Sequence, residues 1–198
     1  RAFCLYFKKK DIIFSEKEFS YFTGHKTIDV IENLSKKFDI KDKKIFYDNI
    51  MDLANNIFKT DLRSINGVKF FLNNINKKVF IGSNSGKKRI IEGLKQTNLI
   101  NYFEDSNIFS FDMVKNPKPS PDVYLKVLED SNIDREETIV IEDSVIGSRA
   151  GISAGIKVIG FTGGSHWYKD RDVNALKNEG VFLISNNYDH ILKVIDNL

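Results

Sequence analysis

The sequence predicts an α/β protein with two parts: a Rossmann-like core, in which a parallel sheet carries helices on both faces, and a small all-helical domain. Two observations lead to this fold class. From about residue 65 onward, short apolar segments alternate with helical segments, which is typical of a parallel sheet. Before residue 60, every segment has helical periodicity. We therefore expect a helical domain over residues 1–62 and the Rossmann-like core over residues 63–198.

The helical domain is predicted from capping and periodicity. Ser15 and Glu18 have the spacing of a capping box, in which the serine caps the helix and the glutamate reaches back to it. Apolar residues recur at helical spacing over residues 27–38 and 45–58. The first residues resemble the middle of an amphipathic helix, because no capping residue precedes them. We expect the natural chain to begin earlier.

The core is predicted from alternating strands and helices. Strands are expected over residues 78–82, 108–110, 138–141, 156–161 and 181–184. Helices are expected over residues 67–76, 87–96, 121–130, 145–154 and 172–178, with a final helix at the end. Ligands bind outside the carboxyl ends of strands in such sheets. The polar residues that follow the strands are therefore the candidate functional residues.

Composition excludes several classes of protein. No apolar run approaches the roughly 18 residues of a membrane span, and no secretory signal is recognisable. The net charge is only +3, with lysines scattered among acidic residues, which speaks against a nucleic-acid partner. Cys4 is the single cysteine, which excludes an internal disulfide and suits a reducing compartment. We expect a cytoplasmic monomer or homodimer without a membrane partner.

Small polar residues follow the first predicted strand. Ser83, Asn84 and Ser85 lie between that strand and a helix whose N-terminal N–H groups and positive dipole end favour a phosphate. The Ser83 hydroxyl adds a donor. The alternative is ordinary capping of the helix by serine or asparagine.

A lysine follows the second predicted strand, between two prolines. Pro117 and Pro119 restrict the loop around Lys118, and a lysine in a fixed position can neutralise a phosphate or a carboxylate. The alternative is a surface turn with a solvated lysine. All three prolines of the chain are in this loop, which favours a shaped loop.

Two adjacent carboxylates, Glu142 and Asp143, follow the third predicted strand. Mg²⁺ prefers one or two carboxylates together with water and substrate phosphate, so this pair is a candidate metal site. The alternative is that Asp143 or Ser144 caps the next helix. Because the carboxyl ends of parallel strands meet at one edge of the sheet, the hydroxyl, the lysine and the acidic pair are expected to lie together.

With these residues the sequence resembles the haloacid dehalogenase-like hydrolase superfamily, in the branch of phosphoglycolate phosphatases, sugar-phosphate phosphatases and beta-phosphoglucomutase. Ser83 lies in a match to the family's second motif, and Lys118 lies in Lys-Pro-Ser-Pro-Asp, a close match to the third. Glu142-Asp143-Ser144, followed by Gly147, matches the fourth. Residues before 62 resemble the helical cap of the family.

The resemblance implies a phosphatase that acts on a small phosphorylated metabolite through an aspartyl-phosphate intermediate. It implies Mg²⁺ held by Asp143 and Glu142, and charge stabilisation by Lys118 and Ser83. Asn84 is expected to bind substrate. His25 and Lys26, on the loop that faces the substrate in the family cap, are expected to do so too, the alternative being a solvated loop.

One family motif is missing. No Asp-x-Asp-Gly, the motif that carries the nucleophile and the acid/base, occurs in the sequence. We expect the sequence to begin after it. Two other functions stay open, a sugar-phosphate mutase and an inactive binding or regulatory relative. The loop containing His166 and Trp167 follows another strand, and it either reaches the mouth of the site or is a surface loop.

Overall fold

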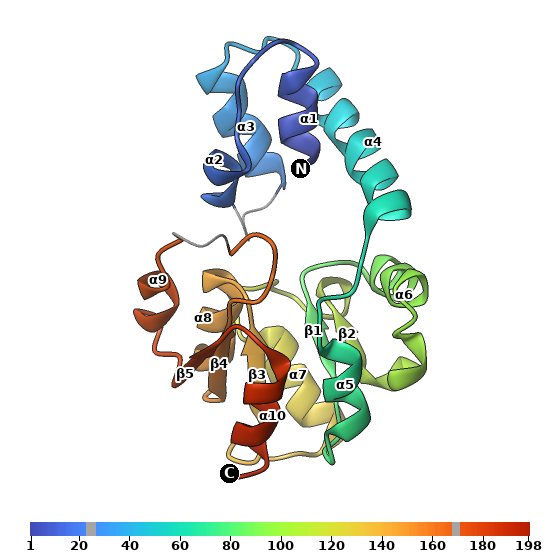
Figure 1. Ribbon diagram of the computed structural model, residues 1–198, viewed down its shortest axis with the longest axis vertical. Coiled ribbons are helices and arrows are strands. Elements are labelled where there is room, and N and C mark those ends of the chain that lie inside the picture. Colours follow the sequence, from blue (N-terminus) through green and yellow to red (C-terminus); the bar gives the residue numbers. More distant parts are fainter. Residues whose placement is uncertain (23–26, 168–170) are drawn as a thin grey trace. The chain divides into compact units, whose positions relative to one another are not determined.

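The computed structural model describes residues 1–22, 27–167 and 171–198. The chain forms two compact units, Arg1–Leu62 and Arg63–Leu198 (Figure 1). Across the described residues, no helix has both the length and the apolar character that a membrane crossing requires.

Unit 1 is helical throughout its described part. Its helices are α1 (Ala2–Lys8), α2 (Glu16–Ser20), α3 (Thr27–Lys37) and α4 (Lys43–Asp61). The capping box of Ser15 and Glu18 is confirmed, since the serine hydroxyl accepts from the Glu18 amide and the Glu18 carboxylate accepts from the Ser15 amide. Phe7, Leu34 and Phe46 are fully buried and bring α1, α3 and α4 together.

Unit 2 alternates strands with helices, as predicted. Its elements are α5 (Val68–Asn74), β1 (Ile81–Ser83), α6 (Lys87–Gln96), η1 (Ile100–Tyr102), η2 (Asp105–Asn107), β2 (Ile108–Ser110), η3 (Phe111–Met113), α7 (Asp122–Ser131), β3 (Ile139–Glu142), α8 (Val145–Ser153), β4 (Lys157–Phe161), α9 (Asn174–Lys177), β5 (Leu183–Ser185) and α10 (Tyr188–Ile195).

The described strands are all parallel, and they form two sheets. β1 pairs with β2, and β4 lies between β3 and β5. Among the described residues, no backbone ladder joins β1 to β3. The α/β class with parallel strands is confirmed.

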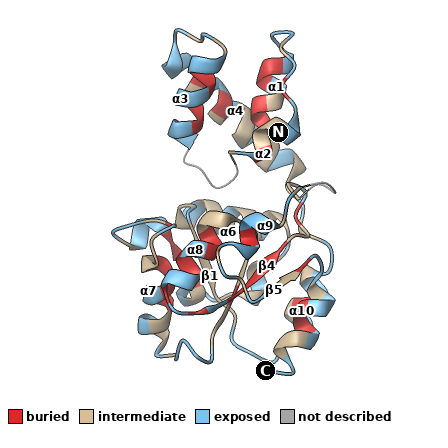
Figure 2. Cartoon of the chain, turned by 90° about the vertical axis from the view of Figure 1, so that its left-hand side faces the viewer, coloured by how far each residue is buried: buried red, intermediate tan, exposed pale blue. Residues whose placement is uncertain are grey.

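Side-chain alternation along the strands gives two buried faces. Val140 and Val158 point into a cluster with residues of α7 and α8, whereas Ile139, Ile159 and Phe161 pack with residues of α5 and α10. Figure 2 shows the buried residues concentrated along β4 and the helices that cover it. This three-layer packing leaves the carboxyl ends of the strands for loops, where polar residues are tolerated.

Candidate active site

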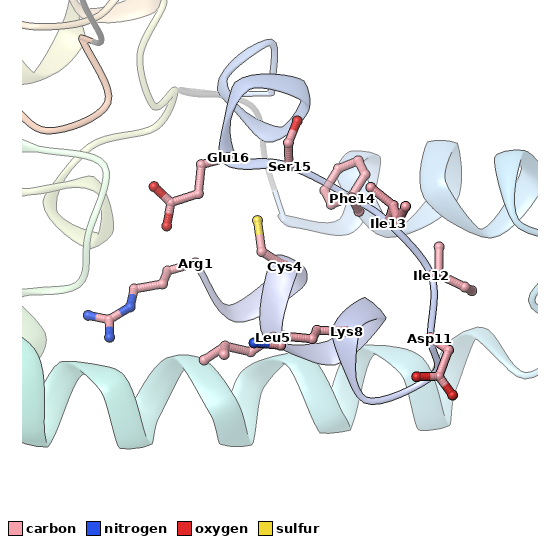
Figure 3. A pocket seen from close by; sticks show the side chains of 10 residues that line it. All are labelled: Arg1, Cys4, Leu5, Lys8, Asp11, Ile12, Ile13, Phe14, Ser15 and Glu16. Carbon is pink, nitrogen blue, oxygen red and sulfur yellow. The ribbon is translucent and has the colours of Figure 1, made fainter.

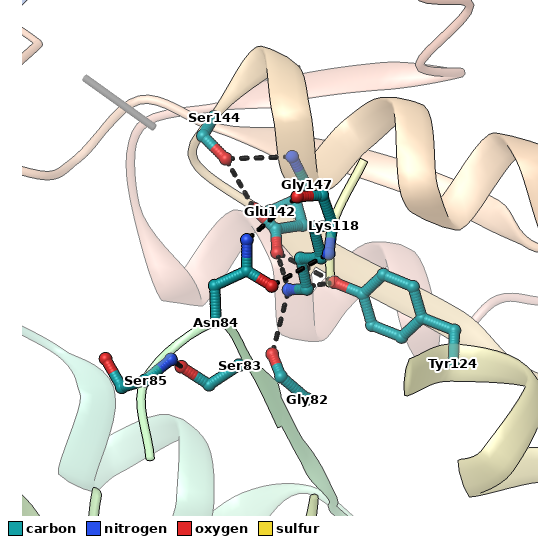
Figure 4. Close-up of polar contacts among 9 residues, drawn as sticks. All are labelled: Gly82, Ser83, Asn84, Ser85, Lys118, Tyr124, Glu142, Ser144 and Gly147. Atoms are coloured by element: carbon teal, nitrogen blue, oxygen red, sulfur yellow. Dashed lines mark hydrogen bonds and ion pairs between the residues drawn. The ribbon is translucent and has the colours of Figure 1, made fainter. Parts of the chain in front are cut away.

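The site is centred on Lys118, which is buried at the carboxyl ends of β1 and β3 (Figure 4). Its Nζ donates to the Gly82 carbonyl at 2.8 Å, to the Tyr124 hydroxyl at 2.7 Å and to Glu142 Oε1. These three acceptors use all three protons of the ammonium group. Lys118 is therefore not a solvated surface lysine. The sequence left a phosphate or a carboxylate as its partner, and in the structure the partner is the Glu142 carboxylate.

The backbone of Lys118 is held by the side chain of Asn84. The Lys118 amide donates to Asn84 Oδ1 at 2.8 Å, and Asn84 Nδ2 donates to the Lys118 carbonyl at 3.0 Å. Both ends of the Asn84 amide group are thus occupied by one peptide segment. Asn84 therefore holds the backbone of Lys118 in place. The expected contact of Asn84 with substrate stays a prediction.

Asp122 closes the loop that carries Lys118. Its carboxylate accepts from the Asn116 amide at 3.0 Å, from Asn116 Nδ2 at 3.1 Å and from the Ser120 hydroxyl. These donors hold the pKa of Asp122 below its usual range, the Ser120 hydroxyl having the largest effect. The loop from Asn116 to Asp122 is therefore fixed by its own side chains at the start of α7.

The Glu142 carboxylate has a partner on each oxygen. Oε1 accepts from Lys118 and, at 2.7 Å, from the Tyr124 hydroxyl, while Oε2 accepts from the Ser144 hydroxyl at 3.1 Å. Ser144 is the N-cap of α8, and its hydroxyl accepts from the Gly147 amide at 3.0 Å. Ser144 therefore fills the capping role that the sequence left open between Asp143 and Ser144.

Gly147 makes room for the Glu142 carboxylate. A Cβ at Gly147 would lie 1.9 Å from Glu142 Oε2, so a side chain here would displace the carboxylate. The glycine in the predicted fourth motif is thus explained by a close approach between α8 and the end of β3.

The Asp143 side chain is more exposed than that of Glu142. The exposed fraction is 49% for Asp143 and 11% for Glu142. Burial raises the pKa of Asp143, and the neighbouring Glu142 charge raises it further. The His166 ring lies near this carboxylate, with Nε2 3.7 Å from Oδ2. Among the described residues, the negative charge of Asp143 is therefore only weakly compensated.

The loop after β4 contacts the backbone of Asp143. Trp167 Nε1 donates to the Asp143 carbonyl at 2.9 Å, and His166 Nε2 lies 3.1 Å from that oxygen. The Arg171 guanidinium stacks over the Trp167 ring at 4.3 Å. Of the two interpretations of this loop, contact with the site is therefore the correct one for His166 and Trp167.

The Ser83 hydroxyl lies one residue beyond Gly82 and accepts from the Ser85 amide at 3.0 Å. As an acceptor in that bond, it keeps its own proton for another partner. Helix α6 begins after Gly86 and has no side-chain cap, so neither Ser83 nor Asn84 caps it.

The Asp112 carboxylate lies near the N-terminus of α6, since a Cβ at Gly86 would lie 3.7 Å from its Oδ2. The Ser110 hydroxyl donates to this carboxylate and holds the pKa of Asp112 below its usual range. The phosphate site that the sequence suggests at this helix stays a prediction. At this strand end, the Ser83 hydroxyl remains as the candidate phosphate donor.

The carboxylates of Asp143 and Glu142 are the candidate oxygen ligands for a metal ion at this site. Among the described residues, no three histidine, cysteine or acidic side chains cluster as a metal site. Mg²⁺ needs only one or two carboxylates when water and phosphate complete its shell. The half-exposed Asp143 fits that requirement, whereas the Glu142 oxygens are engaged by Lys118, Tyr124 and Ser144.

Two predicted residues, His25 and Lys26, lie outside the described residues. Unit 1 does contain a hollow of about 600 Å³, lined by residues of α1 and of the segment that leads to α2 (Figure 3). Cys4 lies in its wall, and burial raises the pKa of that thiol. The hollow therefore presents a neutral thiol, not a nucleophile.

Sequence reasoning missed Tyr124 entirely. Its place beside Val123 on the apolar side of α7 predicts a core residue, and it is indeed 7% exposed. The only signal of another role was a hydroxyl on a buried aromatic ring close to Lys118 in the chain.

The parallel strands, with a lysine and two carboxylates at their carboxyl ends, form a Rossmann-like α/β fold with a candidate active site. The family model for haloacid dehalogenase-like hydrolases matches residues 2–161. The chain belongs to this family of hydrolases.

Relatives with assigned activities resemble much of the chain. A 6-phosphogluconate phosphatase of Escherichia coli strain K12 is 25% identical over 169 residues, which is 84% of this chain and 76% of that protein. A phosphorylated carbohydrates phosphatase of Thermotoga maritima is 33% identical over 130 residues, or 64% of this chain and 59% of that protein. The chain thus matches less than two thirds of the second relative's length.

A solved structure covers nearly all of the chain. A haloacid dehalogenase-like protein from Agrobacterium tumefaciens has a TM-score of 0.89 and 26% identity, over 99% of this chain and 89% of that one. This similarity confirms the predicted fold class.

Proposed function

We propose that this protein is a Mg²⁺-dependent phosphatase that hydrolyses a small phosphorylated carbohydrate through an aspartyl-phosphate intermediate. One observation carries the proposal. Lys118 Nζ bonds to Gly82 and to Glu142, and these two residues directly precede Ser83 and Asp143. These contacts support a site in which a hydroxyl donor, a cation and a candidate metal ligand act together.

Ser83 and Lys118 would bind the phosphoryl group. The Ser83 hydroxyl keeps a proton to donate, and the Lys118 ammonium supplies a positive charge in a site with little water. Because all three Lys118 protons have acceptors, a phosphate oxygen would replace one of them. Such prearranged donors stabilise charge that builds up in a transition state.

Asp143 would be the main protein ligand of Mg²⁺. Glu142 would be a second ligand through a lone pair left free beside its bonds to Lys118, Tyr124 and Ser144. A bound Mg²⁺ would compensate the weakly neutralised Asp143 charge and reduce the repulsion between a phosphate and an attacking carboxylate. The Trp167 and His166 contacts to the Asp143 carbonyl would keep the residue in place while it binds the ion.

The attacking carboxylate of the proposed reaction belongs to the Asp-x-Asp-Gly motif, which does not occur in this sequence. We propose residues 1–62 as a cap domain and residues 63–198 as the catalytic core. His25 and Lys26, which lie outside the described residues, are proposed to bind substrate.

The substrate class rests on the two relatives whose names describe phosphatases of 6-phosphogluconate and of phosphorylated carbohydrates. We propose a sugar phosphate or a sugar-acid phosphate for this protein on that basis.

The test is release of inorganic phosphate by protein expressed from the complete gene. We expect release from an aryl phosphate and from 6-phosphogluconate with Mg²⁺, and its loss when a chelator is added. Conversion of a sugar phosphate into its isomer without phosphate release would show a mutase instead. No turnover of any phosphomonoester, with the protein folded, would show an inactive relative.

A further inference from the structure

We infer that Tyr124 is a positioning residue that holds the Lys118 ammonium and the Glu142 carboxylate in fixed orientation across the ends of β1 and β3. Its effect on catalysis rests on the proposed phosphatase function, whereas the positioning itself is a geometric statement that can be tested without activity.

The hydroxyl of Tyr124 lies between two groups that fix its hydrogen bonds. Lys118 Nζ is 2.7 Å away and can only donate, and Glu142 Oε1 is 2.7 Å away and can only accept. The hydroxyl must therefore accept from the lysine and donate to the glutamate. The proton donors thus follow one another from Lys118 to Tyr124 to Glu142. The Lys118–Glu142 ion pair is the third contact, and it closes a triangle of these three side chains (Figure 4).

The ring of Tyr124 is held as firmly as its hydroxyl. It is 7% exposed, and its centroid lies 4.5 Å from Lys118 Nζ, within the range of a cation–π contact. A Cβ at Gly82 would lie 3.1 Å from its ring, so the ring packs closely on the backbone of β1. The hydroxyl therefore has a fixed place from which to orient the ammonium group.

The bond from Tyr124 to Glu142 does not pass through the lysine, because the Tyr124 hydroxyl donates directly to Glu142 Oε1. When a phosphate oxygen takes a Lys118 proton, Glu142 Oε1 still keeps the Tyr124 donor.

The Tyr124→Phe variant removes the hydroxyl and preserves the ring. One Lys118 proton and one Glu142 oxygen then each lose a buried partner, so the ammonium is less well aimed. We expect kcat to fall about tenfold and KM to change less than twofold, because the hydroxyl touches no substrate. In a Lys118→Met background, the same substitution should change kcat less than twofold, because Tyr124 acts through the lysine.

The orientation of Lys118 can be followed directly by NMR. Three hydrogen bonds in a buried site slow proton exchange, so the Lys118 ammonium should give a ¹H–¹⁵N cross-peak, assigned by its loss in Lys118→Arg. We expect Tyr124→Phe to shift or broaden it. The matched control is Tyr102→Phe, which removes an exposed hydroxyl bonded to Asn73 Oδ1 at 3.0 Å and should leave the cross-peak unchanged.

The result that overturns the inference is an unshifted Lys118 cross-peak in folded Tyr124→Phe protein. A tenfold fall in kcat that persists undiminished in the Lys118→Met background would also overturn it. If the parent shows no phosphatase activity while Tyr124→Phe shifts the cross-peak, the proposed function fails and the positioning role stands.

Discussion

Lys118 and Glu142 form a buried ion pair that joins the carboxyl end of β1 to that of β3. Their side chains are only 7% and 11% exposed. The pair connects two sheets, since Lys118 also donates to Gly82 at the end of β1. No backbone ladder joins these sheets in the part of the chain that the structure describes. The residues proposed for catalysis are therefore also part of what holds the core together.

Removing one partner of this pair should destabilise the fold more than removing both charges. Lys118→Met leaves a buried carboxylate, for which a cost of about 3–5 kcal/mol is typical. The double variant Lys118→Met/Glu142→Gln should recover part of that loss, because no uncompensated charge remains. Denaturant unfolding of the parent, the single and the double variants measures this. A double variant that is less stable than Lys118→Met would contradict the role given to the pair.

A methyl group at Gly147 should disrupt the site. The added Cβ would collide with the Glu142 carboxylate, and overpacking of this kind costs about 1–3 kcal/mol. Gly86→Ala is the control, because a Cβ there meets its nearest neighbours at 3.7 Å, an ordinary contact. Thermal melting should show a lower Tm for Gly147→Ala only. Equal Tm values for the two variants would show that Glu142 is not confined as described.

Mg²⁺ binding at Asp143 should change the fluorescence of Trp167. Trp167 is the single tryptophan of the chain, and its indole donates to the Asp143 carbonyl. Because loss of supporting contacts alone costs 10–100-fold in metal affinity, Asp143→Asn should raise the Mg²⁺ midpoint by about tenfold or more. Asp130→Asn, a surface change at the Lys126 pair, should leave it unaltered. An unchanged midpoint in Asp143→Asn would place the metal elsewhere.

Asp122 should stabilise the Lys118 loop in a pH-dependent way. Its pKa in the folded protein lies below the ordinary value of 3.8, so the folded state favours the ionised form. That stabilisation is complete above the unfolded pKa and is lost as the pH falls through the folded pKa. Asp122→Asn should therefore lower Tm at pH 7, and the difference from the parent should shrink below about pH 4. A Tm difference that grows on acidification would reverse the assigned sign.

The sequence predicted most elements of the core because local signals and tertiary packing agree there. Helix α6 and strand β2 were placed with their observed bounds, since both are flanked by clear changes of pattern. Strand β1 begins at Ile81 and not at residue 78, because the residues before it lack a ladder partner among the described strands. Pairing depends on neighbours distant in the chain, and periodicity alone does not report it.

For the site, the sequence predicted which residues gather but not how they bond. Strand ends were expected to bring Ser83, Lys118 and Glu142 together, and Lys118 does bond to Glu142 and to Gly82, the residue before Ser83. The three-way bonding of Lys118 depends on Tyr124, a residue that reads as core from its spacing on α7. The roles of Asn84 and Asp122 in holding the loop were likewise invisible, because both use side-chain contacts to backbone groups.

The most direct test of the phosphatase site is the kcat/KM of the Lys118→Met variant, with protein from the complete gene, at a temperature where melting curves show it folded. Lys118→Arg, which keeps the charge, serves as the second variant. An oriented cation beside a transferring phosphoryl group contributes about 3 kcal/mol, so Lys118→Met should lose about a hundredfold or more in kcat/KM. Lys118→Arg should recover only part of the lost kcat/KM, because the planar guanidinium group of arginine does not fit where the compact ammonium group of lysine does. Retention of more than about a third of the parent kcat/KM by folded Lys118→Met would contradict the assignment of this cluster as the active site.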